Sequence, residues 1–517
     1  MNKVWLIFIG VLSTADGTAQ HPVGIFENHM DIGHPKLAGD ATYDETTQTY
    51  HIRGAGDNIW FNRDEFQFVY KKISGDFILT ADFAFIGDTG GAVGHRKIGW
   101  MIRESADEAA ASANACKHFD GLVVLQWRPY RGMFMRDPEE EEFYPKKGGQ
   151  TIRLERIGKR ILMEIAHPGE PLQLVGSCET DALEKDVLVG LYICSHDSNT
   201  AASARVWNVR IDIPVIRGYS SNPHAAHPAF QDVMASRLEI LDIADGSRKV
   251  IHEAAGRFEA PNFTPDGKKL LFNQDGALYT IPIEGGDPQR LNTGHVNKIN
   301  NDHMISFDGK MLGISSGKPD GPSGSFIYVL PLAGGEPRLI TQNSPSYLHG
   351  WAPDGKQLVI VAKRDGSPNY NLYRVSLKDN TETLLTAGNN THVDGPEYSP
   401  DGKYIYYNAN PMGTMQIWRM RPDGSEKEQV TFDEYHNWFP HVSPDGKWIV
   451  FISFPPDIDP DAHPSYKDVM LRLMPLGSPG SPRVIAYLYG GQGTINAPSW
   501  SPDSKHLAFV SNSEPRR

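Results

Sequence analysis

One short motif recurs six times in the second half of the chain. In most copies it reads Pro-Asp-Gly-Lys, and it follows a run of strand-forming residues each time. Consecutive copies lie 42 to 58 residues apart. Proline presets φ and Asp-Gly supplies the turn, so each copy predicts a tight hairpin between two strands. The copies are Phe263–Lys268, Ile305–Lys310, Trp351–Lys356, Tyr398–Lys403, Val442–Lys447 and Trp500–Lys505, with Phe307 replacing Pro in the second and Ser504 replacing Gly in the sixth.

The spacing of the motif predicts an all-β propeller. A third and a fourth strand follow the hairpin in most copies, and four strands in roughly 45 residues are typical of one blade. Leu238–Ile251 resembles only the second half of a repeat, whereas Trp500–Asn512 resembles only the first half. Joined, the two ends would form one blade and close the ring. The sequence therefore predicts a six-bladed propeller over residues 236–517.

This repeat resembles that of the TolB-like propellers, over about 280 residues. The resemblance implies the fold far more directly than the function, because one fold can carry many functions. It also implies an alternative in which the chain is a non-enzymatic periplasmic scaffold that binds protein partners.

Residues 20–215 predict a second all-β domain, a jelly-roll sandwich. Short alternating strands such as Phe77–Phe85 are separated by turn residues, and the Ala-rich stretch Ala106–Ala115 is the one that looks helical. Residues 216–235 predict a linker. Four runs of this domain stand out, namely Gly99–Ser105, Arg153–Gly158, Gly190–His196 and Val206–Ile211. Through them the domain resembles the concanavalin/laminin-G-like sandwiches of secreted glycan-processing proteins, and this resemblance implies carbohydrate binding.

Residues 1–19 predict a secretory signal peptide. Lys3 gives a positive start, Val4–Leu12 is apolar, and Gly17–Ala19 offers a cleavage site. The prediction is a periplasmic or secreted protein with no membrane span. A net charge of −13 argues against nucleic acid as a partner. The three cysteines exclude a disulfide framework. Whether Cys178 and Cys194 pair or are buried thiols stays open.

Candidate site residues lie just upstream of each Pro-Asp-Gly turn, at the mouth of the predicted channel. Two interpretations stay open: bonds that hold neighbouring blades together, or a site of convergent imidazoles and carboxylates for metal or acid–base chemistry. The Asp-rich insertion Asp457–Asp468 in the fifth blade could cover such a site. The candidate ligand-binding residues are Glu259, Asn301, Tyr347, His436, Trp438 and Asn496.

A partial resemblance to the oligogalacturonate lyases bears on chemistry at this mouth. In that family a divalent metal binds the substrate carboxylate while a base abstracts a proton. The histidines of this chain do not match that family's ligands one for one. In an enzyme of this kind, His392 or His441 would be acid or base and Asp394 or Glu397 would orient it. His303 with His349 would bind a divalent metal or the substrate.

The leading hypothesis is therefore an exported bacterial protein that binds, and processes as a lyase or hydrolase, an oligosaccharide or an acidic sugar at the channel mouth. The alternative is the TolB-like scaffold, for which the ligands would be proteins or peptides and no metal would be needed.

Overall fold

A computed structural model describes most of the chain. The described residues are 22–87, 94–136, 147–183, 186–214, 234–318, 324–364, 366–387, 391–477 and 480–513. The predicted signal peptide and nearly all of the predicted linker lie outside these ranges. Within them no helix is long and apolar enough to cross a membrane.

The chain divides into two compact units that are interleaved along the sequence. One unit comprises Met1–Ser74, Ala84–Glu141 and Thr180–Arg205. The other comprises Gly75–Phe83, Glu142–Glu179 and Val206–Arg517, and it contains the whole propeller. The division at residues 215 and 236 into sandwich, linker and propeller stays a prediction.

The first unit contains a six-stranded antiparallel sheet in the order β1-β4-β12-β6-β7-β8. The prediction of a helix over the Ala-rich stretch Ala106–Ala115 is wrong. These residues form a turn followed by the start of β7. Alanine has a high helix propensity, but in a short stretch propensity is weak against tertiary contacts, and pairing with β6 and β8 outweighs it. The strands are β1 (Asn28–Ile32), β4 (Phe66–Ile73), β6 (Lys97–Arg103), β7 (Ser112–His118), β8 (Val123–Arg128) and β12 (Val187–Cys194).

A seven-stranded sheet has the order β11-β10-β9-β5-β13-β3-β2. A 3₁₀ turn, Asp181–Leu183, precedes β12. Two large β-sheets are what a sandwich requires, and the lectin-like jelly roll stays a prediction. The strands are β2 (Asp40–Asp44), β3 (Thr49–Gly56), β5 (Phe77–Phe85), β9 (Thr151–Ile157), β10 (Arg160–Ala166), β11 (Gln173–Glu179) and β13 (Asp197–Asp212).

Buried charge is compensated inside the first unit. Asp64 is fully buried and accepts hydrogen bonds from Arg103 and Arg128, each at 2.6 Å. Such a group is tolerated because the remaining guanidinium donors reach backbone carbonyls. All three cysteines of the chain are buried and free, so Cys178 and Cys194 are not paired.

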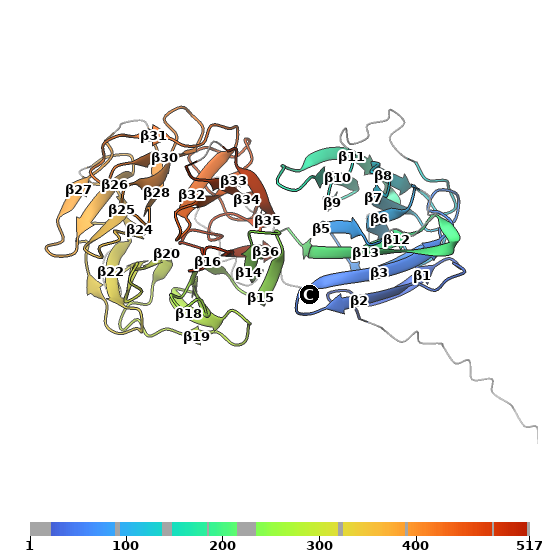
Figure 1. The fold of residues 1–517 in the computed structure, drawn as a ribbon, viewed down its shortest axis with the longest axis horizontal. Helices are drawn as coiled ribbons and strands as arrows, with labels where there is room; N and C mark the ends of the chain where they lie inside the picture. Colours follow the sequence, from blue (N-terminus) through green and yellow to red (C-terminus); the bar gives the residue numbers. More distant parts are fainter. Residues whose placement is uncertain are drawn as a thin grey trace, which may run out of the picture. The chain divides into compact units, whose positions relative to one another are not determined.

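Six further sheets form the propeller, and in the five four-stranded ones the first strand lies toward the centre of the ring (Figure 1). Five sheets have four strands each and are antiparallel throughout. Their strands are β16 (Phe258–Phe263), β17 (Lys269–Gln274), β18 (Ala277–Pro282) and β19 (Gln289–Arg290); β20 (Ile299–Ile305), β21 (Met311–Ser316), β22 (Phe326–Pro331) and β23 (Arg338–Leu339); β24 (Ser346–Trp351), β25 (Gln357–Ala362), β26 (Asn371–Ser376) and β27 (Glu382–Leu384); β28 (Val393–Tyr398), β29 (Ile405–Ala409), β30 (Gln416–Met420) and β31 (Glu428–Gln429); β32 (His436–Val442), β33 (Trp448–Phe454), β34 (Lys467–Pro475) and β35 (Arg483–Gly490).

The sixth sheet joins the two ends of the propeller segment, as predicted. β14 (Ala235–Asp242) pairs with β15 (Arg248–Ala255) on one side and with β36 (His506–Ser513) on the other. A bridge between Trp500 and Leu507 supplies the start of the innermost strand. Strands from both ends of the segment are thus hydrogen-bonded in one blade, which closes the ring.

The turn motif folds through one repeated set of local hydrogen bonds. In the fourth copy Ser399 Oγ donates to Asp401 Oδ1 at 2.7 Å, and the backbone N–H of Lys403 donates to the same oxygen at 3.1 Å. Gly402 has φ of +70°, a conformation that glycine adopts without strain. Ser504, the substituted position of the sixth copy, adopts φ of +62°.

Each inner strand of the five four-stranded blades contains an irregularity just before the turn. The register shifts between Asp394 and Glu397 in β28, and at the equivalent place in β16, β20, β24 and β32. A β-bulge changes which face of the sheet the following side chains take. The side chains near the mouth therefore do not simply alternate between the two faces of each inner strand.

Candidate functional site

A largely buried histidine–aspartate pair joins the innermost strands of the third and fourth blades. Nε2 of His349, on β24, lies 3.2 Å from Oδ1 of Asp394, on β28. The His349 ring stacks on Phe439 of the fifth blade, with centroids 6.1 Å apart. Both predicted residues are therefore in one site, contributed by separate blades.

The surroundings of the His349–Asp394 pair favour its charged form. Burial alone would lower the pKa of His349, but the hydrogen bond to Asp394 and the nearby carboxylates raise it above its ordinary value. Burial would raise the pKa of Asp394, and the opposing effect of His349 holds it well below its ordinary value. Both shifts favour an imidazolium facing a carboxylate in a largely buried setting.

The insertion of the fifth blade reaches this pair. Nε2 of His463 lies 3.6 Å from the other Asp394 oxygen, Oδ2. In the same segment, Oδ1 of Asp461 lies 3.7 Å from Nδ1 of His392. The ring of Trp438 packs between His463 and His392, edge-on to each. The insertion thus brings an imidazole and a carboxylate over residues that the inner strands present.

Asp302, on β20, completes the acidic side of the site. Its side chain is buried, and burial raises its pKa to about 7, with His349 lowering it and Asp394 raising it. A carboxyl group with such a pKa can donate or accept a proton at neutral pH. Asp302 lies between Asn301 and His303, which the sequence did single out, in the strand segment where the register shifts.

Asp302→Asn should make the propeller more stable, and the gain should be larger at pH 8 than at pH 5. Between pH 4 and 7 the folded protein holds a proton that the unfolded chain, with an ordinary pKa of 3.8, has released. The free energy of unfolding therefore falls as pH rises through this window, by about 4 kcal/mol in total. Asparagine has no charge to bury, so the fall disappears. Thermal unfolding of the variant and of the unmodified protein at pH 5 and pH 8 measures this difference in stability.

Asp308→Asn is the matched control for this substitution. Asp308 lies in the exposed turn of the same repeat, where Ser306 lowers its pKa. The control should not show a gain in stability at pH 8. Equal effects of the two substitutions at pH 8 would contradict the assignment.

Glu397 and His441 form a second pair, between the fourth and fifth blades. Nδ1 of His441 lies 2.5 Å from Oε2 of Glu397, and Nε2 lies 2.5 Å from the carbonyl oxygen of Ile495. A carbonyl only accepts, so Nε2 donates to it. Both ring nitrogens are engaged, and the pair ties three segments of the ring together. This arrangement favours the interpretation of a bond between blades for these two residues.

The remaining predicted residues occupy varied positions on the inner strands. Glu259 accepts hydrogen bonds from Asn301 at 3.2 Å and from Arg257 at 2.6 Å. Tyr347 packs edge-on against Tyr370, a residue that the sequence did not single out. Asn496 accepts from the backbone N–H of Gly493 at 2.7 Å and fixes the Gly-rich segment. All of these lie in the propeller.

Two of the predicted histidines, His303 and His436, make no described contact with the His349–Asp394 pair. His303 is fully buried, burial lowers its pKa to about 4, and its neighbours are the backbones of Leu271 and Ala260. His436 accepts a hydrogen bond from the backbone N–H of Met415 at 3.3 Å. Within the described part of the propeller, no three metal-type ligand atoms lie close enough to share an ion. His303 and His349 therefore do not assemble the predicted metal set.

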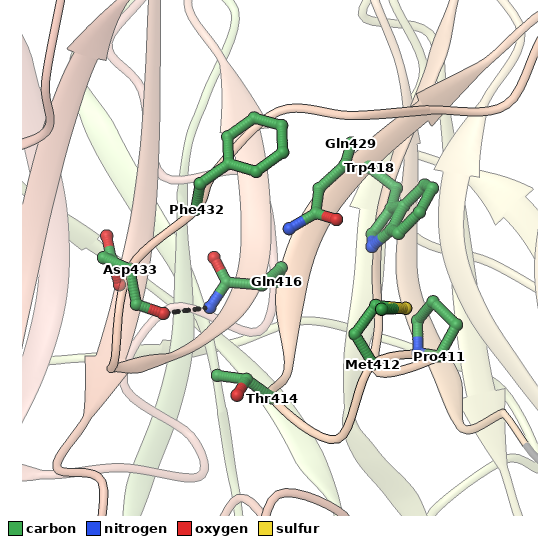
Figure 2. A pocket seen from close by; sticks show the side chains of 8 residues that line it. All are labelled: Pro411, Met412, Thr414, Gln416, Trp418, Gln429, Phe432 and Asp433. Atoms are coloured by element: carbon green, nitrogen blue, oxygen red, sulfur yellow. Dashed lines mark hydrogen bonds between the residues drawn. The ribbon is translucent and has the colours of Figure 1, made fainter.

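A separate pocket lies on the outer strands of the fourth blade (Figure 2). Its volume is about 140 Å³. Figure 2 shows Trp418 and Phe432 on two sides, with Gln416 and Gln429 between them. Met412 and Phe432 are 82% and 77% exposed. The other lining residues are Pro411, Thr414 and Asp433.

Comparison with known proteins agrees with the propeller. Residues 347–457 match the family model described as the TolB beta propeller domain. An uncharacterized protein of Agrobacterium fabrum is 44% identical over 278 residues, which are 54% of this chain and 92% of that protein. The chain belongs to the TolB-like propeller family. A solved structure from Agrobacterium tumefaciens, provisionally described as TolB, has 43% identity and a TM-score of 0.51, covering 55% of this chain and 99% of that one.

Membership of the TolB-like family fixes the fold of the second half of the chain. The Tol-Pal system protein TolB of Francisella tularensis is 25% identical over 244 residues, which are 45% of this chain. The match spans about half of that TolB, 53% of its length. These relationships support a TolB-like propeller and leave the chemistry of its mouth to the residues found there.

Proposed function

We propose that this TolB-like protein is exported and that its propeller mouth binds and processes an oligosaccharide, or another small polar ligand, by acid–base catalysis. The observation that carries the proposal is the buried His349–Asp394 pair beside Asp302, with His463 above it. A structural tie between two blades needs one hydrogen-bonded pair. Four titratable groups from four blades, with pKa values moved in different directions, are typical of catalytic sites.

Each group has a distinct part in the proposed reaction. Asp302, with a pKa of about 7, exchanges a proton with the ligand. The His349 imidazolium, oriented by Asp394, stabilises negative charge that develops on a reacting oxygen. His392, with a partly exposed ring, is the second proton-transfer group. Among the acid and base candidates from the sequence, His392 fits this part better than His441, whose ring nitrogens are both engaged.

Aromatic rings flank these groups and suit a sugar ligand. Tyr370 stacks on His392 with centroids 6.2 Å apart, and Tyr347 packs against Tyr370. Sugar rings offer apolar C–H faces to such side chains and hydroxyl groups to carboxylates. The expected export supports the same class, since glycans outside the cytoplasm are the ligands such a protein would meet.

Full-length protein should be stabilised by at least one member of a panel of neutral, amino and uronic oligosaccharides. A ligand present at 100 times its Kd stabilises the native state by about 2.7 kcal/mol, which is a shift of several degrees in Tm. Thermal shift identifies the ligand, and chromatography of the incubated sugar then detects products. A panel that gives neither a shift nor products would overturn the proposal.

A second candidate function is the TolB-like scaffold that binds proteins. The exposed Met412 and Phe432, which both line the pocket of Figure 2, favour it, because large apolar side chains grouped on a surface suit a protein partner. This function predicts that substitutions at the channel mouth leave partner binding intact.

A further inference from the structure

The six-stranded sheet of the first unit gathers three histidines at one end. Lys97 pairs with His118 across β6 and β7, so His95, two residues earlier, lies beside the end of β7. Cys194 pairs with the same Lys97 across β12 and β6, so His196, two residues later, reaches the same edge. Three neighbouring strands thus deliver an imidazole each to one place.

Asp120 joins the histidines through the turn that follows β7. Its backbone N–H donates to the carbonyl oxygen of Gly94 at 3.0 Å, which ties the turn to the segment before β6. Its Oδ1 accepts from the backbone N–H of Leu122 at 3.0 Å, which fixes the carboxylate. The second oxygen, Oδ2, lies 3.8 Å from Nδ1 of His95.

The spacing of these atoms fits coordination of one ion. Nδ1 of His95 lies 3.3 Å from Nδ1 of His118. His95, His118 and Asp120 each offer one ligand atom, and the three atoms lie within 4.8 Å of one another. Around a tetrahedral zinc ion with bonds of about 2.0–2.1 Å, ligand atoms lie about 3.4 Å apart. The two distances that involve His95 are close to this value.

We propose that His95, His118 and Asp120 form a binding site for a divalent transition metal, with Zn²⁺ the best match. Two imidazoles and one carboxylate are a set that zinc and its neighbours prefer. His196 stands next to the set, with its ring centroid 5.7 Å from that of His95, and is placed to supply a fourth ligand. Its backbone has φ of +59°, an unusual conformation for a non-glycine residue.

Lys97, a buried cation next to the site, is held by other partners. Nζ of Lys97 donates to Asn58 Oδ1 at 3.0 Å, to the carbonyl oxygen of Ile59 at 3.1 Å and to Gln126 Oε1 at 3.5 Å. These three acceptors satisfy the ammonium group. The carboxylate of Asp120 thus remains to balance the charge of a bound metal ion.

The test is zinc binding to the full-length protein, purified without a His-tag and stripped with a chelator. We expect one Zn²⁺ per chain by competition with a chromogenic chelator, and visible d–d absorption when Co²⁺ is used instead. His95→Ala and Asp120→Asn change partly exposed side chains, so both variants should fold. Each should weaken binding by at least about tenfold, since even partners behind the ligands contribute about 10–100-fold.

Two control variants make the result specific to this site. His51→Ala removes an exposed histidine from β3 and should leave zinc affinity unchanged. His349→Ala tests the propeller mouth, and it too should leave zinc affinity unchanged. No stoichiometric binding by the unmodified protein, or binding that His95→Ala leaves intact, would overturn the proposal. Neither result depends on a saccharide, so the function of the mouth is judged separately.

Discussion

Asp394→Asn should lower turnover of the ligand found in the oligosaccharide panel by about 10²- to 10⁴-fold. Asp394 binds His349 through one oxygen and lies near His463 through the other. Asparagine keeps the shape of the side chain and removes its charge. The imidazolium of His349 then loses the carboxylate that orients and stabilises it, and charge developing on the ligand is no longer balanced.

The same substitution should lower the pKa of His349 by about 1–3 units, the usual effect of a neighbouring opposite charge. Asp394 raises that pKa through its hydrogen bond and its charge. His349 of the variant should therefore be neutral at pH values where the unmodified ring is protonated. Titration of the ring by NMR reads this directly and does not depend on knowing the ligand.

Asp287→Asn is the control for the Asp394 experiment. Asp287 is an exposed aspartate of the first blade, so the same change of charge is made away from the mouth. The control should keep turnover and the titration of His349. If Asp394→Asn kept turnover while the pKa of His349 fell, the pair would be a tie between blades and not part of the reaction.

The blades could be predicted from the sequence because their information is local. Ser399, Asp401 and Gly402 close their turn with hydrogen bonds made within five residues, and every copy shares the bond from the Lys backbone N–H to the Asp side chain. Closure of the ring was also predictable, since Leu238–Ile251 and Trp500–Asn512 each lack the half that the other provides. β14 and β36 pair as that argument requires.

The site could be predicted only in part, because its geometry is not local. Aligning the inner strands brought out His349 and Asp394, which do form a pair. It passed over Asp302, since the register shift in β20 changes the direction of residues just before the turn. The alignment also assigned no role to His463, although the insertion that contains His463 was expected to cover a site. How a loop of this length returns to the mouth depends on tertiary contacts.

The first unit shows the same limit. In the sequence His196 is only the last residue of the run Gly190–His196, and the runs that suggested a lectin-like domain contain no ligand set of their own. The pairing of β12, β6 and β7 brings His95, His118 and His196 together from positions far apart in the chain. These three histidines lie together because of the order of the strands in the sheet, which patterns in a single sequence do not specify.

Glu239→Gln should destabilise the protein by about 3–5 kcal/mol, the cost of breaking a buried charge pair. Glu239 lies on β14 in the closing blade, is fully buried, and accepts hydrogen bonds from Arg248 at 2.9 Å and from Ser511 of β36 at 2.5 Å. Glutamine would leave the guanidinium groups of Arg210 and Arg248 without their carboxylate. Because Glu239 links strands from both ends of the propeller, we expect Tm to fall by about 10 °C.

The pH dependence of this loss separates charge from shape. Burial would raise the pKa of Glu239, but Arg210 and Arg248 outweigh it and hold the pKa well below the ordinary 4.5. The carboxylate therefore stabilises the fold above pH 4.5, and the contribution is lost as pH falls below that value. The difference in Tm between the two proteins should shrink on acidification from pH 7 to pH 3.

Glu253→Gln, on the neighbouring β15, is the control: it removes a partly exposed partner of Arg237 and should cost no more than about 1 kcal/mol. If Glu239→Gln is too unstable to purify, Ser511→Ala removes one hydrogen bond to the same carboxylate and should cost about 1–2 kcal/mol. Equal stability of Glu239→Gln and Glu253→Gln at pH 7 would show that the closing blade does not depend on this charge.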